Sequence, residues 1–193
     1  MKIYNENILV VKKEYLFSSD FPQGFFEDEY FVIDKIKEKG FYYDRNLAES
    51  DFNYKQITSY IIFRDKNKNY FVMQRKKGHV LSEKYSIGIG GHLTKEDLTN
   101  KNDLNSWAKR EFEEEVLYNG NYKSNFLGFI NYDGDEIGKI HLGMVFLFEG
   151  DSSNIKIKNE HKSGILMSKE EIISLYSSFE EWSKIFIDKF IVD

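Results

Sequence analysis

The chain has 193 residues, of which 41% are hydrophobic and 17% aromatic, a composition typical of a folded domain and not of a disordered chain. It carries 27 basic and 32 acidic residues, a formal net charge of −5, so it has no basic excess with which to bind a nucleic-acid polymer. It contains no cysteine, which excludes disulfides, thiolate zinc sites and cysteine nucleophiles. Its apolar runs are far shorter than the ~20 residues of a membrane span, and we expect a soluble cytoplasmic protein.

The first 55 residues predict an extension that packs on the core of a single domain. Residues 8–11 (ILVV) indicate a short strand. Residues 26–39 place Phe26, Tyr30, Ile33 and Lys37 on one helical stripe, and Gly40 is expected to cap the end of that helix.

From residue 56 onward, strands and helices alternate. Residues 56–64 and 70–75 predict a β-hairpin, and a glycine-rich segment at 85–93 precedes a predicted helix at about 102–118. Two further strands are expected at 126–131 and 137–148, the second with Ile140, Leu142, Met144, Phe146 and Phe148 on one face. Ser168-x-x-Glu171 and Ser178-x-x-Glu181 are capping-box patterns that predict two C-terminal helices. The pattern indicates an α/β protein with a mixed sheet.

Four glutamates occur in the predicted helix at 102–118, within the run Arg110-Glu111-Phe112-Glu113-Glu114-Glu115. At ~100° per residue, Leu104, Ala108, Phe112 and Val116 form an apolar stripe. Glu111 and Glu115 fall at its edge, Glu114 lies one step further round, and Glu113 points to the opposite side. A solvated helix face is the alternative interpretation of such a run. Two carboxylates ~6 Å apart repel by roughly 3 kcal/mol at an effective dielectric of ~20, so a bound cation is expected, and oxygen ligands favour Mg²⁺ or Mn²⁺.

These residues resemble the Nudix signature, G-x5-E-x7-R-E-U-x-E-E-x-G-U, in which U is a bulky aliphatic residue. Residues 110–115 match it apart from Phe112 at the aliphatic position. The first glycine is Gly91, from which the spacing reaches Asp97, or Gly90, from which it reaches Glu96. In both cases the loop before Arg110 is five or six residues longer than in the signature, and Leu117 replaces the later glycine.

The resemblance covers about residues 56–193, and the N-terminal part is similar to a bacterial subfamily of predicted phosphoesterases. It implies an α/β/α sandwich that hydrolyses a phosphoanhydride bond in a nucleoside diphosphate linked to another moiety. In such an enzyme Glu111, Glu114, Glu115 and the Gly91 carbonyl would bind Mg²⁺ or Mn²⁺. Arg110 would orient the carboxylates, and Glu114 and Arg110 would take part in catalysis.

Other residues are weaker candidates. Glu160 lies where many Nudix enzymes carry an additional glutamate as base or ligand, although a surface glutamate is the alternative. Arg75, Gly90 and His92 are candidates for substrate contact, because Arg75 ends the first hairpin and the other two flank Gly91. His141 is interpreted as a structural histidine, with a place in a cleft as the alternative.

The expected partner is a small nucleoside diphosphate derivative, and the sequence is compatible with a homodimer. A Nudix-fold module that senses a nucleotide without cleaving it is the rival hypothesis. Because such modules commonly lose signature glutamates and all three are present here, an enzyme is favoured. A diphosphate isomerase of the same fold uses a cysteine, which this chain lacks.

Overall fold

The computed structural model describes residues 3–17, 21–28, 31–75, 84–98, 104–158 and 162–192. The strands are β1 (Asn7–Lys12), β2 (Gly24–Phe26), β3 (Phe41–Asp44), β4 (Tyr54–Arg64), β5 (Tyr70–Arg75), β6 (Tyr85–Ser86), β7 (Gly88–Ile89), β8 (Val116–Tyr118), β9 (Tyr122–Asn131), β10 (His141–Gly150), β11 (Ile155–Ile157) and β12 (Lys162–Met167). The helices are α1 (Lys13–Leu16), α2 (Val32–Lys39), α3 (Arg45–Ala48), α4 (Leu104–Glu115), α5 (Glu136–Ile140), α6 (Lys169–Ser174) and α7 (Glu181–Ile187). Short 3₁₀ turns span Lys95–Leu98 and Tyr176–Ser178, and a π-helical turn spans Asp188–Val192.

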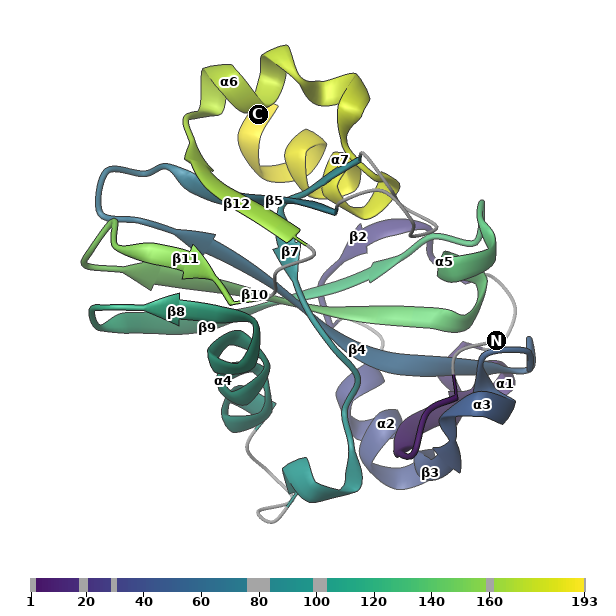
Figure 1. Cartoon of the computed structure of the whole chain (residues 1–193). Coiled ribbons are helices and arrows are strands. Elements are labelled where there is room, and N and C mark those ends of the chain that lie inside the picture. Colours follow the sequence, from purple (N-terminus) through teal and green to yellow (C-terminus); the bar gives the residue numbers. More distant parts are fainter. Residues whose placement is uncertain are drawn as a thin grey trace.

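A mixed sheet in the order β12-β5-β4-β10-β9-β2 forms the centre of the molecule (Figure 1). Strands β4 and β10 are parallel along Gln56–Arg64 and His141–Glu149, and the other neighbours in this order are antiparallel. Strands β7 and β1 also pair with β4, and β3 pairs with β1. Strands β8 and β11 form a separate two-stranded sheet.

Helices cover both faces of the sheet, with α2 and α4 on one face and α6 and α7 on the other (Figure 1). Because side chains alternate along a strand, β4 sends Ile57, Ile61 and Phe63 to the α4 side and Tyr60 and Ile62 to the α7 side. Likewise Leu142, Met144, Phe146 and Phe148 of β10 are fully buried on the α4 side. The predicted α/β/α sandwich with a mixed sheet is therefore confirmed.

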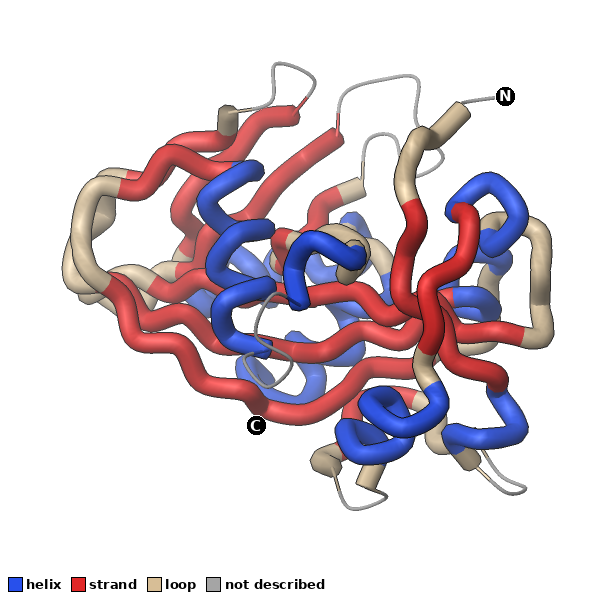
Figure 2. The backbone as a smooth tube through the Cα atoms, turned by 90° about the horizontal axis from the view of Figure 1, so that it is seen from below, coloured by secondary structure: helices blue, strands red, loops and turns tan. Residues whose placement is uncertain are grey.

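The N-terminal residues enter the sheet as strand β1, which Figure 2 shows from below. Val10 is paired with Gln56, and the Leu9 N–H donates to the Leu93 carbonyl at 2.7 Å. The first strand of the chain is thus hydrogen-bonded to the segment that carries Gly91. Within the described residues, no helix is long and apolar enough to cross a membrane.

Several predicted boundaries are wrong because tertiary contacts decide them. The helix expected at 102–118 ends at Glu115, since Val116–Tyr118 pairs with β11. The strand expected at 137–148 starts only at His141, because residues 136–140 form α5, whose N-cap Asp135 accepts a hydrogen bond from the Gly138 N–H. These differences leave the carboxylate run of α4 inside the helix.

The helix expected at 26–39 is shorter, because Phe26 belongs to β2 and α2 starts at Val32. Gly40 ends α2 with φ −71° and ψ 144°, so it is not the left-handed cap that was expected. A Cβ there would lie 2.4 Å from the Ile36 carbonyl oxygen, which is the reason for a glycine. The Ser168–Glu171 capping box is confirmed, but α7 is capped by the Glu180 side chain and not by Ser178.

Candidate active site

Helix α4 turns an apolar side toward the sheet and an acidic side away from it. Phe112 is 1% exposed and stacks on Phe63 with the ring centroids 5.6 Å apart, so the aromatic residue at the aliphatic position of the signature fills the core. Glu111 is buried at the edge of this side. Glu114 and Glu113 are exposed and Glu115 is half-buried.

Arg110 connects three carboxylates at the start of the site. Its guanidinium donates to Glu111 Oε1 at 2.6 Å, to Glu114 Oε2 at 2.7 Å and to Asp97 Oδ2 at 2.7 Å. A second bond runs from Arg110 Nε to the other oxygen of Asp97, so this pair is bidentate. Burial opposes the charge of Arg110, but the hydrogen bonds to Asp97 and Glu114 outweigh it and raise the pKa of Arg110.

Asp97 is the residue that the spacing from Gly91 reaches, and its side chain is 1% exposed. It also accepts hydrogen bonds from the Thr94 backbone N–H at 2.7 Å and from the Thr94 hydroxyl at 2.9 Å, which fixes the turn before α4. Asp97 therefore joins the glycine-rich segment to the carboxylate cluster through Arg110. The five-residue spacing was the signal for this role, which the sequence analysis did not assign.

Glu111 lies directly against Gly91. A Cβ at position 91 would be 2.1 Å from Glu111 Oε2, so only a glycine leaves room for this carboxylate. Burial raises the pKa of Glu111 to about 7, with Arg110 lowering it and Glu114 raising it further. A bound cation would offset the cost of keeping this buried group ionised.

Among the described residues, the donor atoms of this cluster are carboxylate, hydroxyl and backbone oxygens, a set that fits Mg²⁺ or Mn²⁺. In the described part of the chain, however, no group of three or more His, Asp or Glu side chains is already arranged to hold a metal. Glu111 and Glu114 turn to Arg110 instead. The Gly91 carbonyl accepts the Ser59 N–H at 2.9 Å and the Ser59 hydroxyl at 3.5 Å, so it would have to give up the longer of these bonds to bind a metal.

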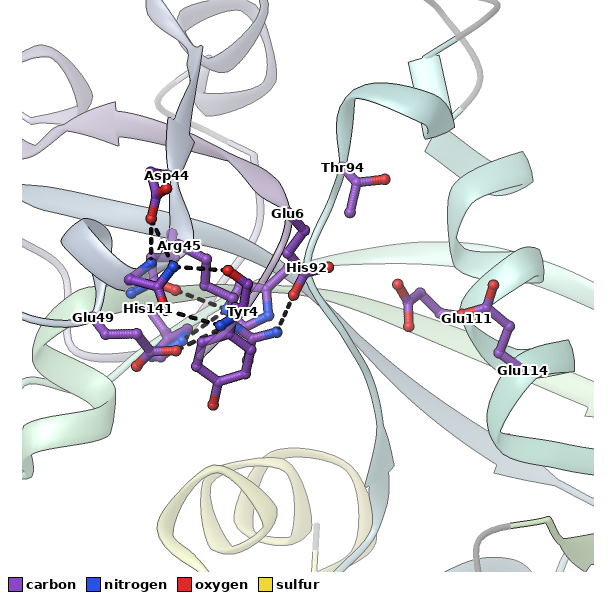
Figure 3. A network of polar contacts seen from close by, with 12 residues as sticks. Tyr4, Glu6, Asp44, Arg45, Glu49, His92, Thr94, Glu111, Glu114 and His141 are labelled. Carbon is purple, nitrogen blue, oxygen red and sulfur yellow. Dashed lines mark hydrogen bonds and ion pairs between the residues drawn. The ribbon is translucent and has the colours of Figure 1, made fainter. Parts of the chain in front are cut away.

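A polar pocket of about 580 Å³ lies between α4 and the N-terminal extension. Its lining residues are Asn5, Glu6, Asn7, Asp44, Thr94, Lys95, Arg110 and Glu114. Figure 3 shows Glu111 and Glu114 on α4 facing Thr94, with Tyr4, Glu6 and Arg45 across from them. Part of the candidate cluster thus opens on a pocket whose far wall belongs to the extension.

His92, a predicted substrate contact, is engaged in a polar network beside the pocket. Its Nε2 lies 2.8 Å from Gln56 Oε1 and 3.1 Å from His141 Nε2. Since His141 Nδ1 donates to the Ile137 carbonyl at 2.7 Å, His141 Nε2 is the acceptor and His92 Nε2 carries the hydrogen. Burial, assisted by the neighbouring His141, holds the pKa of His92 well below its ordinary value. His92 is therefore a neutral group that connects β4 with β10.

The remaining candidate residues from the sequence are Gly90, Arg75 and Glu160. Gly90 is exposed, and a Cβ there would lie 2.0 Å from the Ser59 carbonyl oxygen. Arg75 ends β5, but its side chain lies outside the described residues, as does Glu160. The pocket residues Asn5, Asn7, Asp44 and Lys95 carried no sequence signal of their own.

No family model matches the chain, but two further comparisons find similar proteins. The chain is 28% identical over 155 residues to protein YmaB of Bacillus subtilis (strain 168), which covers 75% of each protein. The crystal structure of Tm1382, a candidate Nudix hydrolase, superposes with a TM-score of 0.81 at 29% identity, over 96% of this chain and 98% of Tm1382. The chain has the fold of the Nudix hydrolases. The MutT protein of Methanosarcina mazei Go1 shares the Nudix fold at 17% identity and a TM-score of 0.51, over 70% of this chain and 92% of its own.

Proposed function

We propose that this Nudix protein is a hydrolase that cleaves a phosphoanhydride bond in a nucleoside diphosphate linked to another moiety, with Mg²⁺ or Mn²⁺ as cofactor. The observation that carries the proposal is the convergence of Asp97, Glu111 and Glu114 on Arg110 beside the pocket. The similarity to Tm1382 over nearly the whole chain supports it.

Each residue has a distinct task in this proposal. Glu111, Glu114 and Glu115 hold the ion, which when bound neutralises charge on the phosphate oxygens. Arg110 keeps two of these carboxylates in position and is itself fixed by Asp97. Lys95 is exposed on the pocket wall and supplies a positive charge for a phosphate. Glu160 is the proposed general base, carried over from the resemblance alone.

Metal binding is tested by thermal unfolding of the purified protein. An ion that binds only the folded state stabilises it by mass action, so millimolar Mg²⁺ or Mn²⁺ should raise the melting temperature. Glu111→Gln and Glu115→Gln should reduce this rise, whereas Glu113→Gln, on the other side of α4, should not. The assignment of the metal ligands is wrong if all three variants respond alike.

Turnover is tested by a screen for metal-dependent cleavage over a panel of nucleoside diphosphate derivatives. Cleavage with Mg²⁺ that stops on chelation supports a hydrolase. Ligand-induced stabilisation without cleavage across the panel would make a nucleotide-sensing module the better description.

A further inference from the structure

The pocket between α4 and the extension has two walls of different chemistry. On the α4 side, the charge of Arg110 is shared among three carboxylates. Lys95 is exposed on the same side and makes no ion pair with a described residue, so its charge is available to a phosphate. This wall suits the diphosphate of a substrate.

The wall of the extension presents amides and carboxylates. Asn5 and Asn7 are exposed at the start of β1, and their side chains make no hydrogen bond within the described residues. Asp44 caps α3 by accepting the Asn46 backbone N–H at 2.8 Å and the Asn46 side-chain N–H at 3.0 Å, both through Oδ1. The hydrogen bonds from Asn46 lower the pKa of Asp44, so this carboxylate is ionised.

The same wall is held in place by a second network. Arg45 binds Glu6 and donates to Glu49 Oε1 at 3.2 Å, and its guanidinium lies 3.8 Å from the centroid of the Tyr4 ring (Figure 3). Glu6 and Glu49 therefore share the single positive charge of Arg45. Because Asp44 adds a further negative charge, this wall carries an excess of negative charge.

We propose, on the basis of the proposed function, that this wall selects diphosphates whose second moiety is uncharged and rich in hydroxyl groups, such as a sugar. Hydroxyl groups of the ligand can donate to the side-chain oxygens of Asp44, Asn5 and Asn7, and the side-chain N–H groups of the two asparagines can donate to hydroxyl oxygens of the ligand. A further phosphate placed at this wall meets Asp44 and Glu6 and is repelled. Asn5, Asn7 and Asp44 are thus specificity-determining residues.

Binding of two non-hydrolysable analogues tests the selection independently of cleavage. Isothermal titration calorimetry with Mg²⁺ compares α,β-methylene ADP-glucose with α,β-methylene ATP. Wild type should bind the sugar analogue more tightly. Asp44→Asn retains the helix cap and removes one charge, so it should tighten the triphosphate analogue about two- to fivefold, the scale of an exposed charge pair. The double variant Asn5→Ala with Asn7→Ala should weaken only the sugar analogue, and Glu170→Gln, exposed on α6, should change neither.

The proposal is overturned if wild type prefers the triphosphate analogue, if Asp44→Asn leaves the ratio of the two affinities unchanged, or if neither analogue binds. Selective binding with no cleavage of the natural diphosphates would overturn the proposed hydrolysis and leave the selection by this wall intact.

Discussion

Gly91 and Glu111 share a space that holds only one side chain. A Cβ at position 91 would lie within 2.8 Å of both carboxylate oxygens and the carboxylate carbon of Glu111. The atoms in conflict belong to the end of a flexible side chain, so an alanine displaces the carboxylate without disrupting the backbone.

Gly91→Ala should therefore affect activity more than stability. A displacement of Glu111 by about 1 Å is expected to lower turnover by ~100-fold, because catalysis depends on the placement of charged groups at this scale. Steady-state kinetics and thermal unfolding measure the two effects. Normal turnover in this variant would show that Glu111 need not lie against position 91.

Asp97→Asn should affect stability as well. The substitution removes the charge that fixes Arg110, in a position where the aspartate side chain is 1% exposed. A loss of about 1–3 kcal/mol in the free energy of unfolding is expected, the scale for a hydrogen bond to a charged group. Denaturant unfolding measures it, with the exposed Glu38→Gln as a control that should stay within about 0.5 kcal/mol. Equal stability of both variants would contradict a positioning role for Asp97.

At the scale of elements, the His92–His141 pair joins three parts of the site. His92 belongs to the segment after Gly91, Gln56 to β4 and His141 to the first position of β10. Burial lowers the pKa of both histidines, so both are neutral in the folded protein.

This pair predicts a loss of stability in acid. The unfolded chain takes up a proton on each histidine near pH 6.5, whereas the folded protein does so only at lower pH, so the free energy of unfolding falls as the pH drops through this range. Glu111 contributes with the opposite sign, because its raised pKa of about 7 lets the folded state bind the proton first. His92→Gln retains Glu111, and its unfolding free energy should decrease less between pH 7.5 and 5 than that of wild type. Parallel pH profiles in denaturant unfolding would contradict the neutral state of His92.

Local patterns predicted the elements that local forces determine. The alternation in residues 142–148, the hairpin of β4 and β5, and the apolar stripe of α4 are all properties of nearby residues. The end of α4 was mispredicted because Val116–Tyr118 is recruited by β11, about forty positions away in the chain. The carboxylates could be named from helical phase, but the far wall of the pocket could not, since Asn5 and Asp44 meet Glu114 only through the pairing of β1 with β3 and β4.

At the scale of the molecule, the extension shares the sheet with the rest of the chain. Strand β1 is hydrogen-bonded to β4, and Ile8, Val10 and Val11 are fully buried. That residues 1–55 extend a single Nudix domain stays a prediction, which their removal tests.

Deletion of residues 1–50 should lower the melting temperature or the solubility, and also the turnover. The deletion uncovers residues 54–56 of β4, which pair with β1, and the segment that carries Gly91. It also removes one wall of the pocket. Thermal unfolding and kinetics of the truncated protein measure these effects. A soluble truncation with unchanged melting temperature and turnover would mean that the extension supports neither the fold nor the site.

The central claim is that the carboxylates of α4 support the hydrolysis of a diphosphate, and phosphorus NMR tests it most directly. A nucleoside diphosphate derivative is incubated with the protein and Mg²⁺, and its two phosphorus signals are followed over time. We predict conversion to two monophosphate products by wild type and by Glu113→Gln, and a rate at least ~100-fold lower for Glu114→Gln, the scale for losing one catalytic electrostatic partner. A diphosphate that stays intact with wild type across the substrate panel, or equal rates for Glu113→Gln and Glu114→Gln, would contradict the account.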